Sequence, residues 1–188
     1  MISTQKKIFI IGTVGIPGNY GGFETLVENL ALYHHQHEDC DVTVYCSAAA
    51  YTKPRRSWYK KFRLRYLPVK ANGIQSILYD SLSLVLSALR GADTILLLGV
   101  SGAIVLPIIR LKKNVKIVTN IDGIEWKREK WGKIASKYLL FAEWVAVTFS
   151  DVVIADNRGI QEYVSNKYKI NTQLIPYGGD TIFTPSPI

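Results

Sequence analysis

The sequence has no apolar run that approaches the roughly 20 residues a helix needs to span a bilayer. Its N-terminus leads straight into a strand pattern and lacks the apolar region of a signal peptide. Cysteine is scarce, with only Cys40 and Cys46, and these two do not form the close pair of a metal site. These shortages argue against a membrane-spanning or disulfide-rich protein. We expect a cytoplasmic chain whose cysteines are structural and which holds no metal ion.

The chain also lacks internal repeats and low-complexity linkers, which favours a single domain for its 188 residues. Hydrophobic residues make up 48% and charged residues 20%, the composition of a globular protein with a buried core. The formal net charge of +8 has a local source, because the segment 53–70 holds eight basic residues and no acidic one. Outside that segment, 15 basic residues balance 15 acidic ones.

Short apolar runs rich in β-branched residues alternate with segments of helical period, which is typical of βα units around a parallel sheet. Several runs are apolar throughout, as strands covered by helices on both faces are. We therefore expect a Rossmann-like, doubly wound α/β fold with about seven strands. The predicted strands are Ile8–Thr13, Asp41–Cys46, Arg63–Val69, Thr94–Leu98, Lys116–Ile121, Val152–Ala155 and Thr172–Ile175. The predicted helices are Gly22–His35, Gln75–Arg90, Ser101–Leu111, Gly132–Ser150 and Gly159–Tyr168. This domain takes up residues 1–180, and the tail 181–188, with two prolines, is interpreted as the start of a linker to a further domain.

The first predicted strand is followed by a loop with five glycines among residues 12–22. Gly21 and Gly22 open a helix whose free N–H groups favour an anion, so a phosphate or a sugar hydroxyl is a suitable ligand, and Glu24 follows in the first turn. The spacing is not G-x-G-x-x-G, which disfavours a dinucleotide site. The alternative is a loop that only shapes a tight turn, although βα loops are usually about 2–6 residues long and longer ones are often functional.

After the fifth predicted strand, the ten residues 122–131 hold three carboxylates, three cations and two tryptophans. Asp122 lies at the strand tip beside a glycine, where a carboxylate can accept a proton or bind a sugar hydroxyl, and it is our candidate catalytic residue. Trp126 offers a ring face to a sugar, Arg128 offers a charge to a phosphate, and Glu125 is a further candidate for substrate binding. The alternative is a set of solvated helix partners around buried tryptophans.

A third polar block, at residues 150–160, contains the sixth predicted strand. Asn157 follows the strand as a candidate substrate-binding residue, and capping of the next helix is its alternative, structural role.

These motifs resemble a known enzyme family. The run Tyr20-Gly21-Gly22-Phe23-Glu24 is similar to the glycine loop of the GT-B glycosyltransferases of family 4, and the segments 150–160 and 175–180 resemble other segments of that family. The block 122–131 resembles the signature of a subgroup that includes bacterial rhamnosyltransferases and whose N-terminal region is catalogued as a domain of unknown function. Many members of the wider family have a histidine where this chain has Asp122. The likeness spans about residues 8–180.

The resemblance implies the N-terminal, acceptor-side half of a retaining glycosyltransferase. The whole enzyme would transfer a sugar, preferably rhamnose, from a nucleotide diphosphate sugar to a glycan or lipid-linked acceptor in cell-surface polysaccharide synthesis. It also implies that the donor is a substrate with no resident cofactor, and that a second Rossmann-like domain completes the site, so that this half alone is inactive. The rival hypothesis is a non-catalytic module that binds a nucleotide or an anionic surface.

The basic segment interleaves cations with aromatic residues ahead of the third predicted strand. Such a mixture suits an anionic membrane surface, with the aromatic rings at the interface. The candidate residues are Arg55, Arg56, Trp58, Lys60 and Lys61, and they predict a peripheral contact with the inner face of a membrane. A solvated loop and a nucleic-acid surface are the alternatives, and we expect no nucleic-acid partner.

Overall fold

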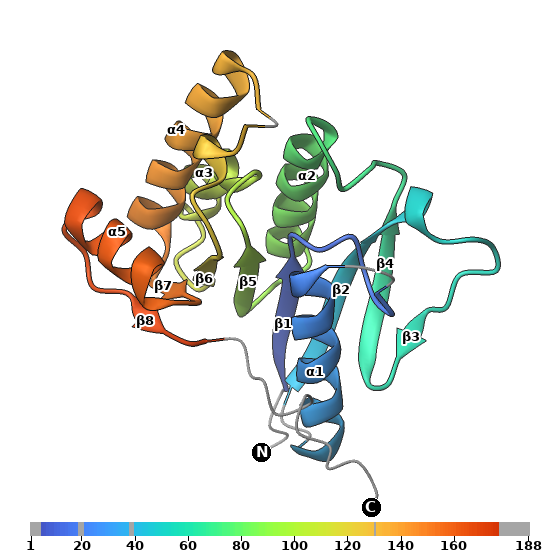
Figure 1. The fold of residues 1–188 in the computed structure, drawn as a ribbon. Coiled ribbons are helices and arrows are strands. Elements are labelled where there is room, and N and C mark those ends of the chain that lie inside the picture. Colours follow the sequence, from blue (N-terminus) through green and yellow to red (C-terminus); the bar gives the residue numbers. More distant parts are fainter. Residues whose placement is uncertain (1–4, 19–20, 38–39, 130, 177–188) are drawn as a thin grey trace, which may run out of the picture.

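One sheet organises the protein (Figure 1). The computed structural model describes residues 5–18, 21–37, 40–129 and 131–176, and the strands in this part of the chain lie in the order β3-β4-β2-β1-β5-β6-β7-β8. All neighbouring pairs are parallel except β3 and β4. The strands are β1 Lys6–Ile11, β2 Cys40–Ser47, β3 Trp58–Tyr59, β4 Phe62–Leu67, β5 Thr94–Leu98, β6 Lys116–Ile121, β7 Val152–Ala155 and β8 Gln173–Leu174.

The predicted doubly wound α/β fold is thereby confirmed, with eight described strands in place of about seven. The additional strand is β3, a two-residue segment that pairs antiparallel with β4 at the edge of the sheet. We call β3, β4 and the turn between them the edge hairpin. Its two-residue strand was missed because it is too short for an alternating pattern to show.

Five α-helices and three short 3₁₀ segments connect the described strands. The helices are α1 Gly22–His37, α2 Gln75–Leu89, α3 Leu106–Ile109, α4 Lys133–Phe149 and α5 Arg158–Tyr168, and the 3₁₀ segments are η1 Ala48–Ala50, η2 Ala103–Val105 and η3 Glu125–Lys127. One predicted helix, Ser101–Leu111, is wrong in form: η2 and the single turn of α3 take its place. Pro107 explains the break, because proline has no N–H and fits only the first turn of a helix.

The core lies in two clusters of buried side chains, one on each face of the first strands. On one face, Val27 and Ala31 of α1 pack with Ile10, Val42 and Val44. On the other face, residues of α2 and α4 pack with alternate residues of β1, β2, β5 and β6. Helices cover both faces of the sheet. The polar residues that follow the strands therefore lie together at the carboxyl ends of the strands, where ligands bind in doubly wound folds.

Gly12 directly follows β1, and the backbone of β5 lies very close to it. A Cβ atom on Gly12 would lie 1.9 Å from the carbonyl oxygen of Leu98, and the residue has a φ of +96°, which only glycine adopts readily. The carboxyl ends of these two neighbouring strands therefore meet without a side chain between them.

Two parts of the sequence interpretation lie outside the described residues: most of the segment 175–180 and the linker 181–188. Within the described part of the chain, no helix has both the length and the apolar character needed to cross a membrane.

Candidate active site

A cavity of about 150 Å³ opens at the carboxyl ends of β1, β5 and β6, and we call it the carboxyl-end cavity. Gly12, Leu98 and Gly99 line it from the strand ends, and Gly73 and Ser76 line it at the start of α2. Three carboxyl groups also line it, those of Asp80, Asp122 and Glu125. They are not close enough together to hold one metal ion, since no three potential ligands among the described residues meet in that way.

A larger hollow, about 560 Å³, lies between α4, β7 and β8. Asp151 is the one carboxylate that lines it, and this group already pairs with Arg110 at 2.9 Å and accepts the Ile117 N–H at 2.7 Å. The carboxyl-end cavity is therefore the better candidate, because its acidic groups face an open space at the end of parallel strands.

Asp122 follows the last residue of β6 and is partly buried at the carboxyl-end cavity. Burial raises the pKa of its carboxyl group, Glu125 raises it further, and the positive charge of Arg128 acts in the opposite direction. A carboxylate with a raised pKa is a better proton acceptor than an exposed one. The position thus suits the role that the sequence assigns to it.

Glu125 and Arg128 form a unit on and beside η3. The Arg128 guanidinium contacts one carboxylate oxygen of Glu125 at 2.9 Å, and the Trp131 indole N–H donates to the other at 3.3 Å. Gly123 leaves space for this arrangement, since a Cβ there would lie 3.2 Å from Arg128 Nη2. Of this unit, Glu125 and Trp131 line the carboxyl-end cavity.

Asp80 is an acidic residue of the cavity that the sequence analysis missed. It lies on α2 and is 3% exposed, and the Ser101 hydroxyl donates to it. Burial raises the pKa of Asp80 to about 7, while the hydrogen bond from Ser101 acts in the opposite direction. Tyr138 of α4 ties the same loop by donating to the Ser101 carbonyl at 2.7 Å. An acidic residue inside an otherwise apolar helix was the only sequence signal for this site.

The glycine loop is held by Glu24, which lies in the first turn of α1. Its Oε1 accepts the Thr13 hydroxyl at 2.9 Å and the Val14 N–H at 2.8 Å, and the side chain is buried. A Cβ on Gly21 would lie 1.9 Å from Glu24 Oε2, and Gly21 has a φ of +131°. The structure thus shows Glu24 bracing the loop in front of Gly22, the first residue of α1. Direct contact of Gly21, Gly22 or Glu24 with a substrate stays a prediction.

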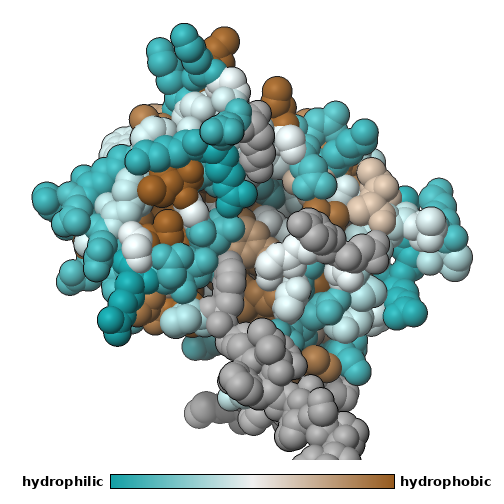
Figure 2. Space-filling view, in the orientation of Figure 1, coloured by the Kyte–Doolittle hydropathy of each residue, from teal (hydrophilic) through white to brown (hydrophobic). Residues whose placement is uncertain are grey.

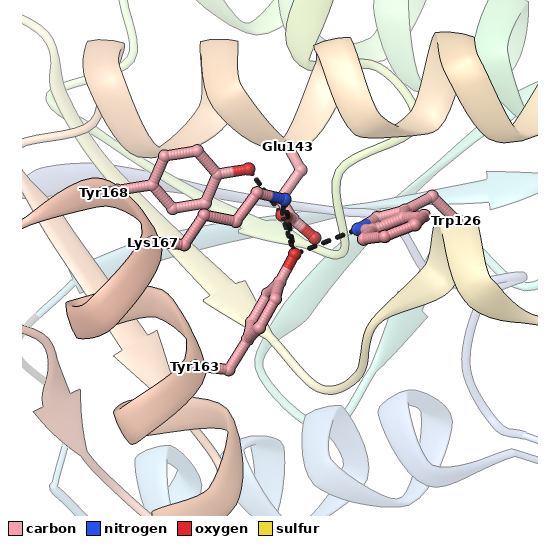
Figure 3. A network of polar contacts seen from close by, with 5 residues as sticks. All are labelled: Trp126, Glu143, Tyr163, Lys167 and Tyr168. Atoms are coloured by element: carbon pink, nitrogen blue, oxygen red, sulfur yellow. Dashed lines mark hydrogen bonds and ion pairs between the residues drawn. The ribbon is translucent and has the colours of Figure 1, made fainter.

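Trp126 belongs to a polar network away from the carboxyl-end cavity (Figure 3). Its indole N–H donates to the Tyr163 hydroxyl at 2.9 Å, and that hydroxyl donates to buried Glu143 at 2.6 Å. Tyr168 also donates to Glu143, at 2.5 Å, and Lys167 pairs with it at 2.9 Å.

The ammonium group of Lys167 also lies 4.8–4.9 Å from the ring centroids of Trp126, Tyr163 and Tyr168. The network therefore joins η3 to α4 and α5 through one buried carboxylate. Its members come from segments up to 42 residues apart, from Trp126 to Tyr168, which is why the sequence pattern did not reveal it. Contact of Trp126 with a sugar ring stays a prediction.

Asn157 caps α5, with its side-chain oxygen accepting the Ile160 N–H at 2.9 Å. Its amide group donates to Asp156 at 2.7 Å. The structural role is therefore present, and substrate binding by Asn157 stays a prediction. Neither it nor Arg128 lines the carboxyl-end cavity.

The five basic and aromatic residues of the predicted membrane contact do not form one surface. Arg55 is turned inward, donating to the Ala48 carbonyl at 2.8 Å and lying over the Tyr66 ring. Arg56, Trp58 and Lys60 are exposed. Lys60 and Lys61 form the turn of the edge hairpin, at the amino end of β4. They therefore lie on the side of the sheet where the parallel strands begin, and the carboxyl-end cavity lies on the side where these strands end.

The buried Asp80 carboxyl makes stability depend on pH. The unfolded chain releases this proton near the ordinary pKa of 3.8 and the folded chain keeps it to about 7, so the folded state holds more protons in between. Stability contributed by the neutral group is complete below the lower value and is lost as the pH rises to the higher one. Urea unfolding at pH 5 and pH 8 should show a clear loss in the parent chain and a smaller loss in Asp80→Asn. The exposed Glu162→Gln variant is the control, and equal pH dependence in all three chains would contradict the assignment.

The network around Glu143 predicts that Tyr163→Phe destabilises the fold. The change removes the hydroxyl that donates to the buried Glu143 carboxylate and accepts from Trp126 and Lys167, and a hydrogen bond to a charged group contributes about 1.5–3 kcal/mol. Tyr59→Phe is a matched control, because no described residue hydrogen-bonds to the Tyr59 hydroxyl, and its change should stay within about 0.5 kcal/mol. Denaturant unfolding measures both, and equal costs would show that the network contributes nothing specific.

Several solved structures share this fold. Sucrose-phosphate synthase from Thermosynechococcus elongatus matches with a TM-score of 0.72 and 16% identity over 97% of this chain and 51% of that one. UGT89C1 of Arabidopsis thaliana, complexed with UDP-L-rhamnose, matches with a TM-score of 0.51 and 12% identity over 94% of this chain and 49% of that one. UDP-N-acetylglucosamine 2-epimerase from Rickettsia bellii matches with a TM-score of 0.53 and 14% identity over 90% and 44%. The chain thus spans about half the length of these proteins.

These likenesses show that the chain has the fold of the Rossmann-like domains in GT-B glycosyltransferases. No curated protein matches the chain in sequence. A family model, described as a domain of unknown function (DUF1972), matches residues 5–180. The chain therefore belongs to the DUF1972 family, and its fold is that of a Rossmann-like domain of the kind found in GT-B glycosyltransferases.

Proposed function

We propose that this chain is the acceptor-side half of a retaining glycosyltransferase. The enzyme transfers a sugar from a nucleotide diphosphate sugar, its donor substrate, to a glycan or lipid-linked acceptor. The observation that carries the proposal is the carboxyl-end cavity, where Asp80 and Asp122, both with raised pKa values, face an open space beside the glycine loop. Perturbed carboxyl groups at the ends of parallel strands are typical of active sites.

Each side of the cavity suits one step of such a transfer. Asp122 orients the acceptor hydroxyl and takes its proton as the new glycosidic bond forms. The N-terminus of α1, behind Gly21, stabilises the negative charge that develops on the departing diphosphate. A second domain of similar size supplies the remaining donor contacts, and the enzyme needs no resident cofactor.

The residues around the opening of the carboxyl-end cavity support the proposal of a lipid-linked acceptor. Figure 2 shows a largely hydrophilic face, with hydrophobic residues at the upper tips of α2 and α4. Ile74 and Leu78 on the α2 side are 73% and 61% exposed, and Ile134 at the start of α4 is 87% exposed. Gly73, Ser76 and Trp131, which line the cavity, are close neighbours of these residues in the chain. An acceptor with an apolar chain would find contact surface at this entrance.

The sugar and the subgroup rest on the block 122–131. Its resemblance to the rhamnosyltransferase signature supports family 4, rhamnose as the donor sugar, and cell-surface polysaccharide synthesis as the process. The three carboxylates and two tryptophans of this block include the groups that shape one wall of the cavity, namely Asp122, Glu125 and Trp131.

The function is tested in the full-length protein with Asp122→Asn. We expect kcat to fall about 10²- to 10⁴-fold, the usual contribution of a positioned acid or base, with donor affinity little changed. Glu129→Gln, an exposed change in the same block, is the control. Transfer from UDP-L-rhamnose and related donors is measured alongside calorimetry of the present chain with the same compounds. A normal rate in Asp122→Asn would refute the role of this residue, and binding without any transfer would favour the non-catalytic module.

We also propose that the edge hairpin contacts an anionic membrane at its cytoplasmic face. Trp58 and Lys60 of the hairpin and Arg56, two residues before it, are exposed and support this, since a basic residue near anionic lipid contributes about 1 kcal/mol and an aromatic ring settles at the interface. The double variant Arg56→Glu with Lys60→Glu should lose sedimentation with anionic vesicles. Lys113→Glu with Lys137→Glu, two exposed lysines elsewhere, should lose much less. Equal loss in both double variants would show that vesicle binding depends on net charge alone and not on the edge hairpin.

A further inference from the structure

A separate cluster of positive charge lies near the amino ends of β1, β2 and β4. Lys7, Arg63, Arg65 and Arg90 line a hollow of about 260 Å³ there, which we call the arginine hollow. Phe9 and Thr43, both 5% exposed, also line it and form its floor. None of these residues lines the carboxyl-end cavity.

Strand register brings the cations together. Arg63 pairs with Thr43 and Arg65 with Tyr45, so both arginines stand beside the same face of β2. Arg90, at the end of α2, donates to the Tyr45 hydroxyl at 3.0 Å. Burial raises the pKa of Tyr45, and the charges of Arg90 and Arg65 both act against this rise. The charges of Arg65 and Arg90, which come from different elements, therefore both act on the Tyr45 hydroxyl beside the hollow.

These charges are poorly compensated. In the described part of the chain, Asp41 is the one carboxylate that lines the hollow. Among the described residues, the side chains of Lys7, Arg63 and Arg65 form no ion pair, and the buried Nε of Arg63 has no hydrogen-bond partner. Nearby Asp93 accepts the Lys7 backbone N–H at 2.8 Å. Like charges that line one hollow repel, and a buried donor without a partner is costly, so an anion would relieve both penalties.

We propose that the arginine hollow binds a phosphate group, at a site distinct from the carboxyl-end cavity. Guanidinium groups are planar forks that bind phosphate through two parallel hydrogen bonds, and three of them line this hollow beside a lysine. Helix α2 runs between the two sites: Ser76 and Asp80 near its start line the carboxyl-end cavity, and Arg90, ten residues after Asp80 and about 15 Å along the helix, lines the arginine hollow.

The hollow has space beside it for the organic part of a phosphate ester. An adjoining hollow of about 290 Å³ shares Asp41 and Arg63 with it and adds Trp58 and Lys61. Trp58 is half exposed and lies against the Arg63 guanidinium, 4.9 Å from ring centroid to carbon. The phosphate belongs either to a small ester in solution or to a phospholipid headgroup, and the two sources share this chemistry.

The test measures binding of pyrophosphate, glycerol phosphate and vesicles to the present chain and to Arg63→Gln with Arg65→Gln. Calorimetry and the rise in thermal midpoint report the soluble ligands, because a ligand of the folded state stabilises it. Cosedimentation with phosphatidic acid vesicles, against phosphatidylcholine vesicles, reports the lipid source. We expect binding at least about tenfold weaker in the double variant, since hydrogen bonds to charged groups are strong.

Lys113→Gln with Lys137→Gln is the charge-matched control and should bind like the parent chain. Without ligand, the arginine variant should keep or raise its thermal midpoint, because it relieves repulsion, which separates lost binding from misfolding. Binding that is confined to soluble phosphates or to phosphatidic acid vesicles, and lost only in the arginine variant, supports the proposal and identifies the source. It is overturned if no phosphate ligand binds, or if the control variant weakens binding as much as the arginine variant does.

Discussion

The close approach of β1 and β5 at Gly12 is the constraint on which the candidate site depends. A Cβ there would overlap the Leu98 carbonyl oxygen, so any other residue would force apart the two strand ends that line the carboxyl-end cavity. Glu24 adds the second half of this arrangement, because its buried carboxylate holds the glycine loop just beyond Gly12. Asp122, directly after β6, and Asp80 of α2 then face a space of fixed shape.

Two buried acidic residues show how the fold uses the same chemical group in different ways. Glu143 accepts hydrogen bonds from the Tyr163 and Tyr168 hydroxyls and pairs with the Lys167 ammonium group, so its negative charge is balanced where it lies. Among the described residues, the Ser101 hydroxyl is the one side-chain partner of Asp80, and burial raises the pKa of Asp80 to about 7. The first arrangement ties η3 to α4 and α5. The second leaves a carboxyl group able to exchange a proton beside the cavity, as an active site requires.

The direction of β4 and its register with β2 decide where the basic residues of the segment 53–70 lie. The edge hairpin turns at the amino end of β4, so its lysines lie at the opposite edge of the sheet from Asp122. Arg63 and Arg65 are neighbours of the hairpin turn in sequence, yet the register with β2 groups them with Lys7 and Arg90 in a hollow of their own. One basic segment of the sequence thus supplies two surfaces, an exposed hairpin and a lined pocket.

The sequence by itself determined the sheet, seven of its strands within about two residues at each end, and the location of Asp122, because apolar runs and glycines act locally. Tertiary structure alone decided which side chains meet. It placed Asp80 at the same cavity as Asp122, paired the Trp126 N–H with the Tyr163 hydroxyl, turned Arg55 inward and brought together the residues of the arginine hollow. The reason is that such contacts depend on strand order and helix packing between segments distant in the chain, and local patterns carry no record of either.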